Sequence, residues 1–139
     1  MKILSKIILV TIILFCFSCE DQGLVVKCAD CLNEEPGDAV LDIKLDSNNS
    51  SIETIVNVYE GNIEDSVLYS TLKTIASSTS IKVTLNKKYT VTATYKEQDD
   101  LYVAIDSATP RVRYEKSQCD KPCYFTYDKV LDLRLKYTK

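Results

Sequence analysis

From Val40 to the C-terminus, the chain alternates apolar and polar residues with a period of two. The first run places Leu41, Ile43 and Leu45 on one side and charged residues on the other. Because successive side chains of a strand point to opposite faces, this pattern predicts a half-buried strand. The same alternation or composition predicts eight further strands, over 52–58, 67–72, 81–85, 89–95, 101–105, 111–114, 124–127 and 131–137, the last being the most regular.

One window admits a second interpretation. Between Val67 and Ala76, the apolar residues would also line one face of a short amphipathic helix. We favour a strand there, because no other window keeps a helical period for three turns. Turn-forming residues separate the runs, among them Gly61-Asn62, Asn86-Lys87-Lys88 and Asp128-Lys129.

About seven to nine short strands rich in Val, Ile, Thr and Tyr are what a two-sheet β-sandwich needs. We therefore predict an all-β domain over residues 40–139, built as an antiparallel two-sheet β-sandwich. The pattern resembles the immunoglobulin-like and transthyretin-like sandwich domains of exported lipoproteins. That resemblance implies an architecture and no particular function.

The N-terminal residues 1–18 have the organisation of an export signal. Lys2 and Lys6 precede an apolar run over 7–17, which is too short for a membrane-spanning helix of roughly 20 residues. The segment Cys16-Phe17-Ser18-Cys19 resembles the lipobox of bacterial lipoproteins, in the looser form of Bacteroidota, although Cys16 stands where most lipoboxes have an aliphatic residue. The resemblance implies cleavage after Ser18 and lipidation of Cys19. The alternative is an ordinary secretory signal followed by an incidental cysteine.

Residues 19–39 are then expected to be a lipidated N-terminus and tether, because Gly23, Pro36 and Gly37 lie among acidic and small polar residues. Glu20 and Asp21 resemble the acidic signal that sends Bacteroidota lipoproteins to the outer face of the outer membrane. We expect a lipid-anchored protein of the cell envelope, at the outer membrane or cell surface. A merely charged tether is the alternative.

Charge and composition exclude several functions. Removing residues 1–18 takes away two lysines and no acidic residue, so the net charge goes from 17 − 20 = −3 to 15 − 20 = −5. An acidic domain is repelled by nucleic-acid phosphates, so we expect no nucleic-acid partner and membrane attachment through the lipid alone. The chain has no histidine, which removes the imidazole of nucleophile pairs and of the usual metal sites. We expect neither enzymatic activity nor a cofactor.

Four cysteines lie in two close pairs, Cys28 with Cys31 and Cys119 with Cys123. They fit structural disulfides, a tetrahedral zinc site or a redox dithiol. Export favours disulfides, while the three-residue gap of the second pair weakens the zinc interpretation and the irregular acidic context of the first weakens the redox one. Links between the pairs are favoured over links within them, because closing a loop of roughly 90 residues removes more freedom from the unfolded chain. The sequence does not fix the connectivity.

Tyrosine is enriched, with nine residues. Four of them fall on apolar faces and are expected in the core: Tyr89, Tyr95, Tyr127 and Tyr137. Three others fall in phase with polar neighbours and are candidates for an exposed aromatic platform that binds a protein or a glycan: Tyr59, Tyr102 and Tyr124. The alternative is cross-strand pairing on a sheet surface.

Two short motifs, Asp65-Ser66-Val67 and Asp106-Ser107-Ala108, match the acceptor motif for O-glycosylation of Bacteroidota exported proteins and make Ser66 and Ser107 candidate modification sites. The favoured hypothesis for the whole chain is a lipid-anchored, non-enzymatic binding module for a protein or a glycan. The alternative is a structural or assembly subunit of an envelope complex. A zinc-binding or thiol redox protein is less favoured.

The lipoprotein interpretation predicts that Cys19→Ala releases the protein from the membrane fraction. The reason is that the apolar residues of the remaining chain are patterned for their own core, so that only the acyl chains hold the protein to the bilayer. Fractionation of cells and mass spectrometry of the native N-terminus test this. A mature chain that starts anywhere other than an acylated Cys19 would contradict it.

Overall fold

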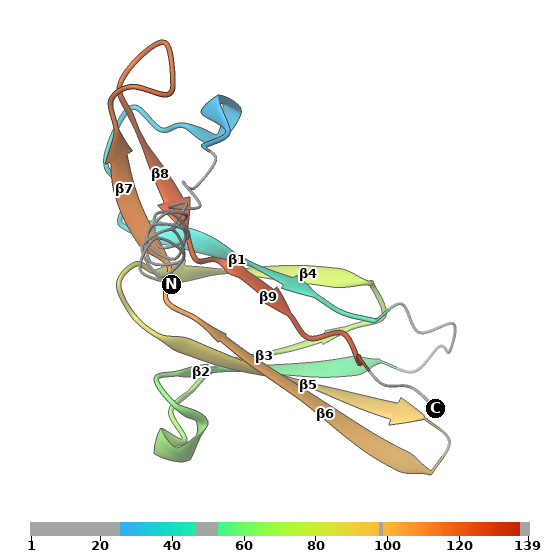
Figure 1. Ribbon diagram of the computed structural model, residues 1–139. Helices are drawn as coiled ribbons and strands as arrows, with labels where there is room; N and C mark the ends of the chain where they lie inside the picture. Colours follow the sequence, from blue (N-terminus) through green and yellow to red (C-terminus); the bar gives the residue numbers. More distant parts are fainter. Residues whose placement is uncertain (1–25, 47–52, 98, 137–139) are drawn as a thin grey trace, which may run out of the picture.

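The computed structural model describes residues 26–46, 53–97 and 99–136. In this part of the chain the fold is all-β, with two short 3-10 turns, η1 (Cys28–Asp30) and η2 (Ile63–Asp65), and no α-helix (Figure 1). No helix of the described residues is long and apolar enough to cross a membrane. The expected signal peptide and Cys19 lie outside the described residues. The nine strands are β1 (Asp38–Lys44), β2 (Thr54–Glu60), β3 (Leu68–Thr74), β4 (Ser78–Thr84), β5 (Tyr89–Glu97), β6 (Asp100–Ala108), β7 (Arg111–Glu115), β8 (Cys123–Tyr127) and β9 (Val130–Asp132).

The strands form three sheets. A three-stranded sheet has the order β4-β1-β9, a four-stranded sheet has the order β3-β2-β5-β6, and β7 and β8 form a hairpin of their own. All neighbours are antiparallel except β1 and β9, which run parallel. Figure 1 shows the first two sheets as two layers and the β7-β8 hairpin projecting from one end of them. The parallel pair is a departure from the purely antiparallel arrangement that the sequence predicts.

The inner faces of the two larger sheets bury one common apolar core. Alternate residues of each strand point into it, as the period of two requires. The three-stranded sheet and the residue after it supply Leu41, Ile43, Val83, Leu131 and Leu133, and the four-stranded sheet supplies Val56, Val58, Tyr89, Val91, Ala93 and Tyr95.

Two tyrosines lie wholly inside this core, and each has a partner for its hydroxyl group. The Tyr95 hydroxyl donates to the carbonyl of Leu133 at 2.8 Å and accepts from the amide of Asp46 at 3.3 Å. The Tyr89 hydroxyl accepts from the amide of Thr84 at 3.2 Å. The prediction that Tyr89 and Tyr95 are core residues is confirmed. Tyr127 is half-buried, and Tyr137 lies outside the described residues.

Each predicted strand has a counterpart. The window from Val67 to Ala76 contains strand β3, as favoured over a helix. Two of the predicted turns carry a residue other than glycine with positive φ, Asn86 at 62° and Asp128 at 53°. Such a conformation is accessible to Asn and Asp at low cost, which explains their place there.

The strand that looked most regular in the sequence is the shortest in the structure. The prediction of a strand over 131–137 is wrong in extent, since β9 ends at Asp132. Pairing with β1 continues only as far as the amide of Leu133, which donates to Lys44 at 3.0 Å. The Asp132 carboxylate then accepts from the guanidinium of Arg134 at 2.6 and 2.8 Å and from its backbone amide at 3.3 Å. This local side-chain bonding turns the chain out of the ladder.

We predict that Tyr95→Phe destabilises the domain by about 1–3 kcal/mol, because it leaves the Leu133 carbonyl without its buried donor and the Asp46 amide without its acceptor. Urea denaturation measures the change. The matched variant Tyr102→Phe removes a hydroxyl from an exposed side chain and should cost under about 0.5 kcal/mol. Equal stability of the two variants would contradict the role assigned to the Tyr95 hydroxyl.

Candidate binding surface and disulfide clasp

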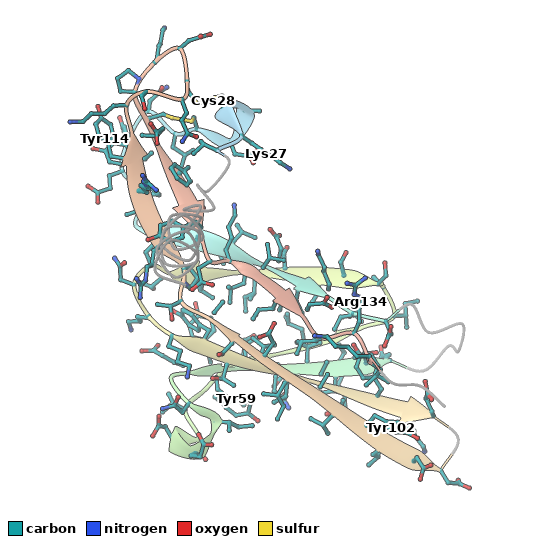
Figure 2. All side chains as sticks on the ribbon, viewed as in Figure 1. Lys27, Cys28, Tyr59, Tyr102, Tyr114 and Arg134 are labelled. Carbon is teal, nitrogen blue, oxygen red and sulfur yellow. A yellow bond between two sulfur atoms is a disulfide. The ribbon has the colours of Figure 1, made fainter. Side chains whose placement is uncertain are left out.

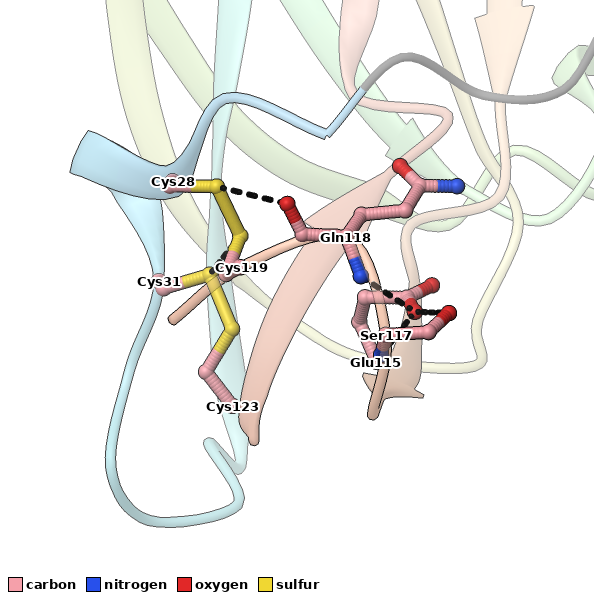
Figure 3. Close-up of a disulfide and its surroundings, with 7 residues drawn as sticks. All are labelled: Cys28, Cys31, Glu115, Ser117, Gln118, Cys119 and Cys123. Atoms are coloured by element: carbon pink, nitrogen blue, oxygen red, sulfur yellow. Dashed lines mark hydrogen bonds between the residues drawn. A yellow bond between two sulfur atoms is a disulfide. The ribbon is translucent and has the colours of Figure 1, made fainter. Parts of the chain in front are cut away.

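Two disulfides join the segment before β1 to the β7-β8 hairpin. The sulfur of Cys28 is bonded to that of Cys119, and the sulfur of Cys31 to that of Cys123, across sequence separations of 91 and 92 residues (Figure 3). The structure therefore has links between the two cysteine pairs, as loop entropy favours, and not links within them. We call these two bridges the disulfide clasp.

A pair of main-chain hydrogen bonds reinforces the clasp. Leu32 forms an isolated antiparallel bridge with Tyr124 of β8, and each amide donates to the carbonyl of the other residue at 2.8 Å. Within the predicted tether of residues 19–39, the segment from Cys28 to Leu32 thus lies against the hairpin, and β1 begins at Asp38. A single residue pair has no periodicity, so no sequence signal could have found this contact.

The turn that carries Cys119 is organised by Glu115, the last residue of β7. Its buried side chain accepts hydrogen bonds from the Ser117 amide at 2.8 Å, the Ser117 hydroxyl at 2.9 Å and the Gln118 amide at 3.2 Å (Figure 3). The bonds from Ser117 favour the ionised form and lower the pKa of the Glu115 carboxyl, against the effect of desolvation. Glu115 belongs to no recognisable motif, so no pattern in the sequence pointed to this role.

The three candidate tyrosines do not form one platform. Tyr59 pairs with Thr90 on the outer face of the four-stranded sheet, whereas Tyr102 pairs with Tyr95 on the core side of the same sheet. Tyr124 lies on the hairpin, where its ring is 4.8 Å from that of its cross-strand neighbour Tyr114. Figure 2 shows Tyr59, Tyr102 and Tyr114 well apart from one another. Tyr124 therefore fits the alternative interpretation, cross-strand pairing on a sheet surface.

Both candidate glycosylation sites are exposed. Ser66 follows η2 with a left-handed backbone, at φ 54°, and Ser107 lies in β6. Their modification stays a prediction.

The most exposed apolar row of a described strand lies on β6. Leu101, Val103 and Ile105 are 68%, 56% and 58% exposed. They point away from the core, because the intervening Ala104 pairs with the buried Ala93. Strand β6 is an edge strand of the four-stranded sheet: in the described part of the chain, only β5 is hydrogen-bonded to it. We call its open side, with these three residues, the β6 edge.

Of the devices that usually protect an edge strand, β6 has one, the inward-facing charge of Asp106, which pairs with the buried Val91. Its pairing with β5 is continuous from Tyr89 to Glu97, with no bulge, and the strand contains no lysine and no proline. Long edge strands with exposed apolar residues are templates for another strand. The alternation in the sequence predicts the strand but did not reveal this surface. One indication was present in Asp106, because a charge in phase with the core-side residues of β6 leaves the apolar residues Leu101, Val103 and Ile105 on the other face.

Hollows lie on both sides of the β6 edge. One, of about 400 Å³, separates it from the segment after β9 and is lined by Val103, Ala104, Ile105, Asp106, Asp132, Arg134, Leu135 and Lys136. The other, of about 410 Å³, lies beside η2 and is lined by Asn62, Ile63, Glu64, Lys88, Thr90, Ile105, Asp106 and Ser107. The Asp106 carboxylate accepts from the amide of Asp132 at 3.0 Å and so fixes β6 against β9, and both residues line the first hollow.

Comparison with known proteins gives no relative for this chain: no family model, no curated protein and no solved structure matches it.

The bonds to Glu115 make an acid-dependent contribution to stability. Because its pKa is lowered in the fold, this contribution is present above the ordinary value of 4.5 and is lost as the pH falls through the folded pKa. We predict that Glu115→Gln lowers Tm at pH 7 and that its deficit relative to wild type shrinks on acidification below about pH 4.

Thermal denaturation at a series of pH values checks this. Ser117→Ala removes only the hydroxyl donor and should have a smaller effect of the same sign. A constant Tm difference between Glu115→Gln and wild type at every pH would contradict the assignment.

Proposed function

We propose that this protein is a lipid-anchored, non-enzymatic protein of the cell envelope, at the outer membrane or cell surface, that binds a partner protein through the β6 edge. The signal-like residues 1–18 and the lipobox-like Cys19 support the anchor. The disulfide clasp suits an oxidising compartment outside the cytoplasm.

We further propose that the domain is a β-sandwich of the transthyretin-like type. In the immunoglobulin constant-type order, the first strand pairs with the second. Here β1 lies between β4 and β9, and β2 lies between β3 and β5. This strand order favours the transthyretin-like member of the two resemblances, with the β7-β8 hairpin as an excursion between β6 and β9.

The observation that carries the binding proposal is the open, apolar β6 edge. An extended polypeptide can satisfy the main-chain groups of such an edge and add a strand to the sheet, while its side chains fill pockets on alternate positions. The two hollows beside Ile105 are placed to receive such side chains. An extended protein segment fits this surface better than a glycan does, because glycan sites depend on aromatic stacking and the three candidate tyrosines are dispersed.

We predict that a photo-crosslinking residue in place of Leu101 captures a specific partner in intact cells and that Val103→Lys weakens binding of that purified partner at least tenfold. A lysine on the edge strand would place a charge against an apolar neighbour and oppose strand addition. The affinity is measured by calorimetry.

The matched control is Val40→Lys, which puts the same charge on the outer face of β1, where Val40 is 44% exposed. It should leave the affinity unchanged. The same photo-crosslinking residue in place of Val40 should capture no partner. Equal loss of affinity in both lysine variants, or capture from position 40 and not from position 101, would contradict the β6 edge as the site. Capture of a second copy of the chain would favour the structural or assembly subunit, and binding to a glycan array that Val103→Lys leaves intact would replace the protein partner by a sugar.

A further inference from the structure

Three sulfur atoms of the clasp form a compact cluster, and the fourth is bonded to one of them. The ligand atoms of Cys31, Cys119 and Cys123 all lie within 4.8 Å of one another, and Cys28 is bonded to Cys119 (Figure 3). The sulfurs of Cys31 and Cys119 belong to different disulfides and are only 3.6 Å apart. Two independent bridges do not require this proximity.

The distance between the two disulfides at their closest sulfurs is that of neighbouring ligands in a tetrahedral metal site. With Zn–S bonds of about 2.3 Å, the sulfurs of a four-cysteine zinc site are roughly 3.8 Å apart. The observed 3.6 Å between Cys31 and Cys119 is close to this value. We propose that, when both disulfides are reduced, Cys28, Cys31, Cys119 and Cys123 together bind one Zn²⁺ ion.

The three-residue gap between Cys119 and Cys123 does not prevent this arrangement. In the structure, both of these sulfurs lie within 4.8 Å of the Cys31 sulfur. Cys123 is fixed as the first residue of β8 and Cys31 follows η1, whose Cys28 carbonyl accepts from the Cys31 amide at 3.4 Å. Each pair is therefore held by its own local structure.

The two pairs also have a contact that does not depend on sulfur. The Leu32–Tyr124 main-chain bridge lies next to Cys31 and Cys123 in the sequence. The bonds from Ser117 and Gln118 to Glu115 hold the turn that leads into Cys119. Reduction of the clasp thus leaves non-covalent contacts that keep the four thiols close together.

The chemistry is balanced by a dithiol reductant. Each disulfide accepts two electrons and two protons, its S–S bond breaks to give two thiols, and the dithiol closes to its own disulfide. Zinc then binds the four sulfurs as thiolates and displaces their protons to solvent. The oxidised clasp has no thiolate to offer, so the same four residues bind the metal in one redox state only.

The test uses the full chain, purified in detergent, reduced with excess dithiothreitol and passed through gel filtration without oxygen before zinc is added. The reduced protein should retain one Zn²⁺ per chain, and the oxidised protein should retain none. Co²⁺ in place of Zn²⁺ should give the absorption of tetrahedral thiolate coordination. Added zinc should also raise the Tm of the reduced protein.

The variant Cys31→Ser with Cys123→Ser removes one ligand from each pair and keeps Cys16 and Cys19 as in wild type. It should bind zinc at least 100-fold more weakly after reduction. Retention of zinc at wild-type affinity by this variant would place the metal elsewhere and overturn the proposal. So would a reduced wild-type protein that retains no zinc and shows no increase of Tm. Neither result bears on binding at the β6 edge.

Discussion

The burial of two sheet faces against each other is the interaction on which the rest of the structure depends. The three-stranded and four-stranded sheets share one apolar core, into which each strand projects every second side chain. The large rings of Tyr89 and Tyr95 also bring hydroxyl groups into this core, and a buried hydroxyl group needs a hydrogen-bond partner. The Tyr95 hydroxyl is hydrogen-bonded to the Leu133 carbonyl and to the Asp46 amide, so it links β5 to the segments that follow β9 and β1. These hydrogen bonds from a core residue therefore also hold the four-stranded sheet against the three-stranded sheet where β1 and β9 end.

The β7-β8 hairpin lies beyond that core and is held by other means. A two-stranded hairpin is marginally stable in water, and this one gains a third partner in Leu32 and two covalent links in the clasp. The hydrogen bonds to Glu115 order the turn from which Cys119 emerges. As a result, the chain before β1 starts from a fixed place on the hairpin. In a protein anchored through Cys19, this contact would set where the domain leaves its anchor.

Neither the common core nor the β7-β8 hairpin covers the β6 edge. Its inner residues Ala104 and Ala108 are small and pack beside the core, while Leu101, Val103 and Ile105 face solvent. An edge of this kind is a liability for a protein without a partner. The bond between Asp106 and the Asp132 amide joins the edges of the two sheets, and both hollows are lined in part by Asp106. The surface is thus suited to a ligand that brings both main-chain groups and side chains.

The sequence by itself determined the strands, because alternation with a period of two and turn residues such as Asn86 and Asp128 are local properties of the chain. It also indicated that the cysteine pairs are joined to each other, since loop entropy depends only on separation along the chain. Only the tertiary structure decided which face of β6 is buried. Tyr59 and Tyr102 lie on opposite faces of one sheet, and the apolar row of β6 faces outward, because the pairing with β5 turns Ala104 toward the core. The length of β9 and the pairing of Cys28 with Cys119 were likewise decided by contacts between segments far apart in the sequence, which no local pattern encodes.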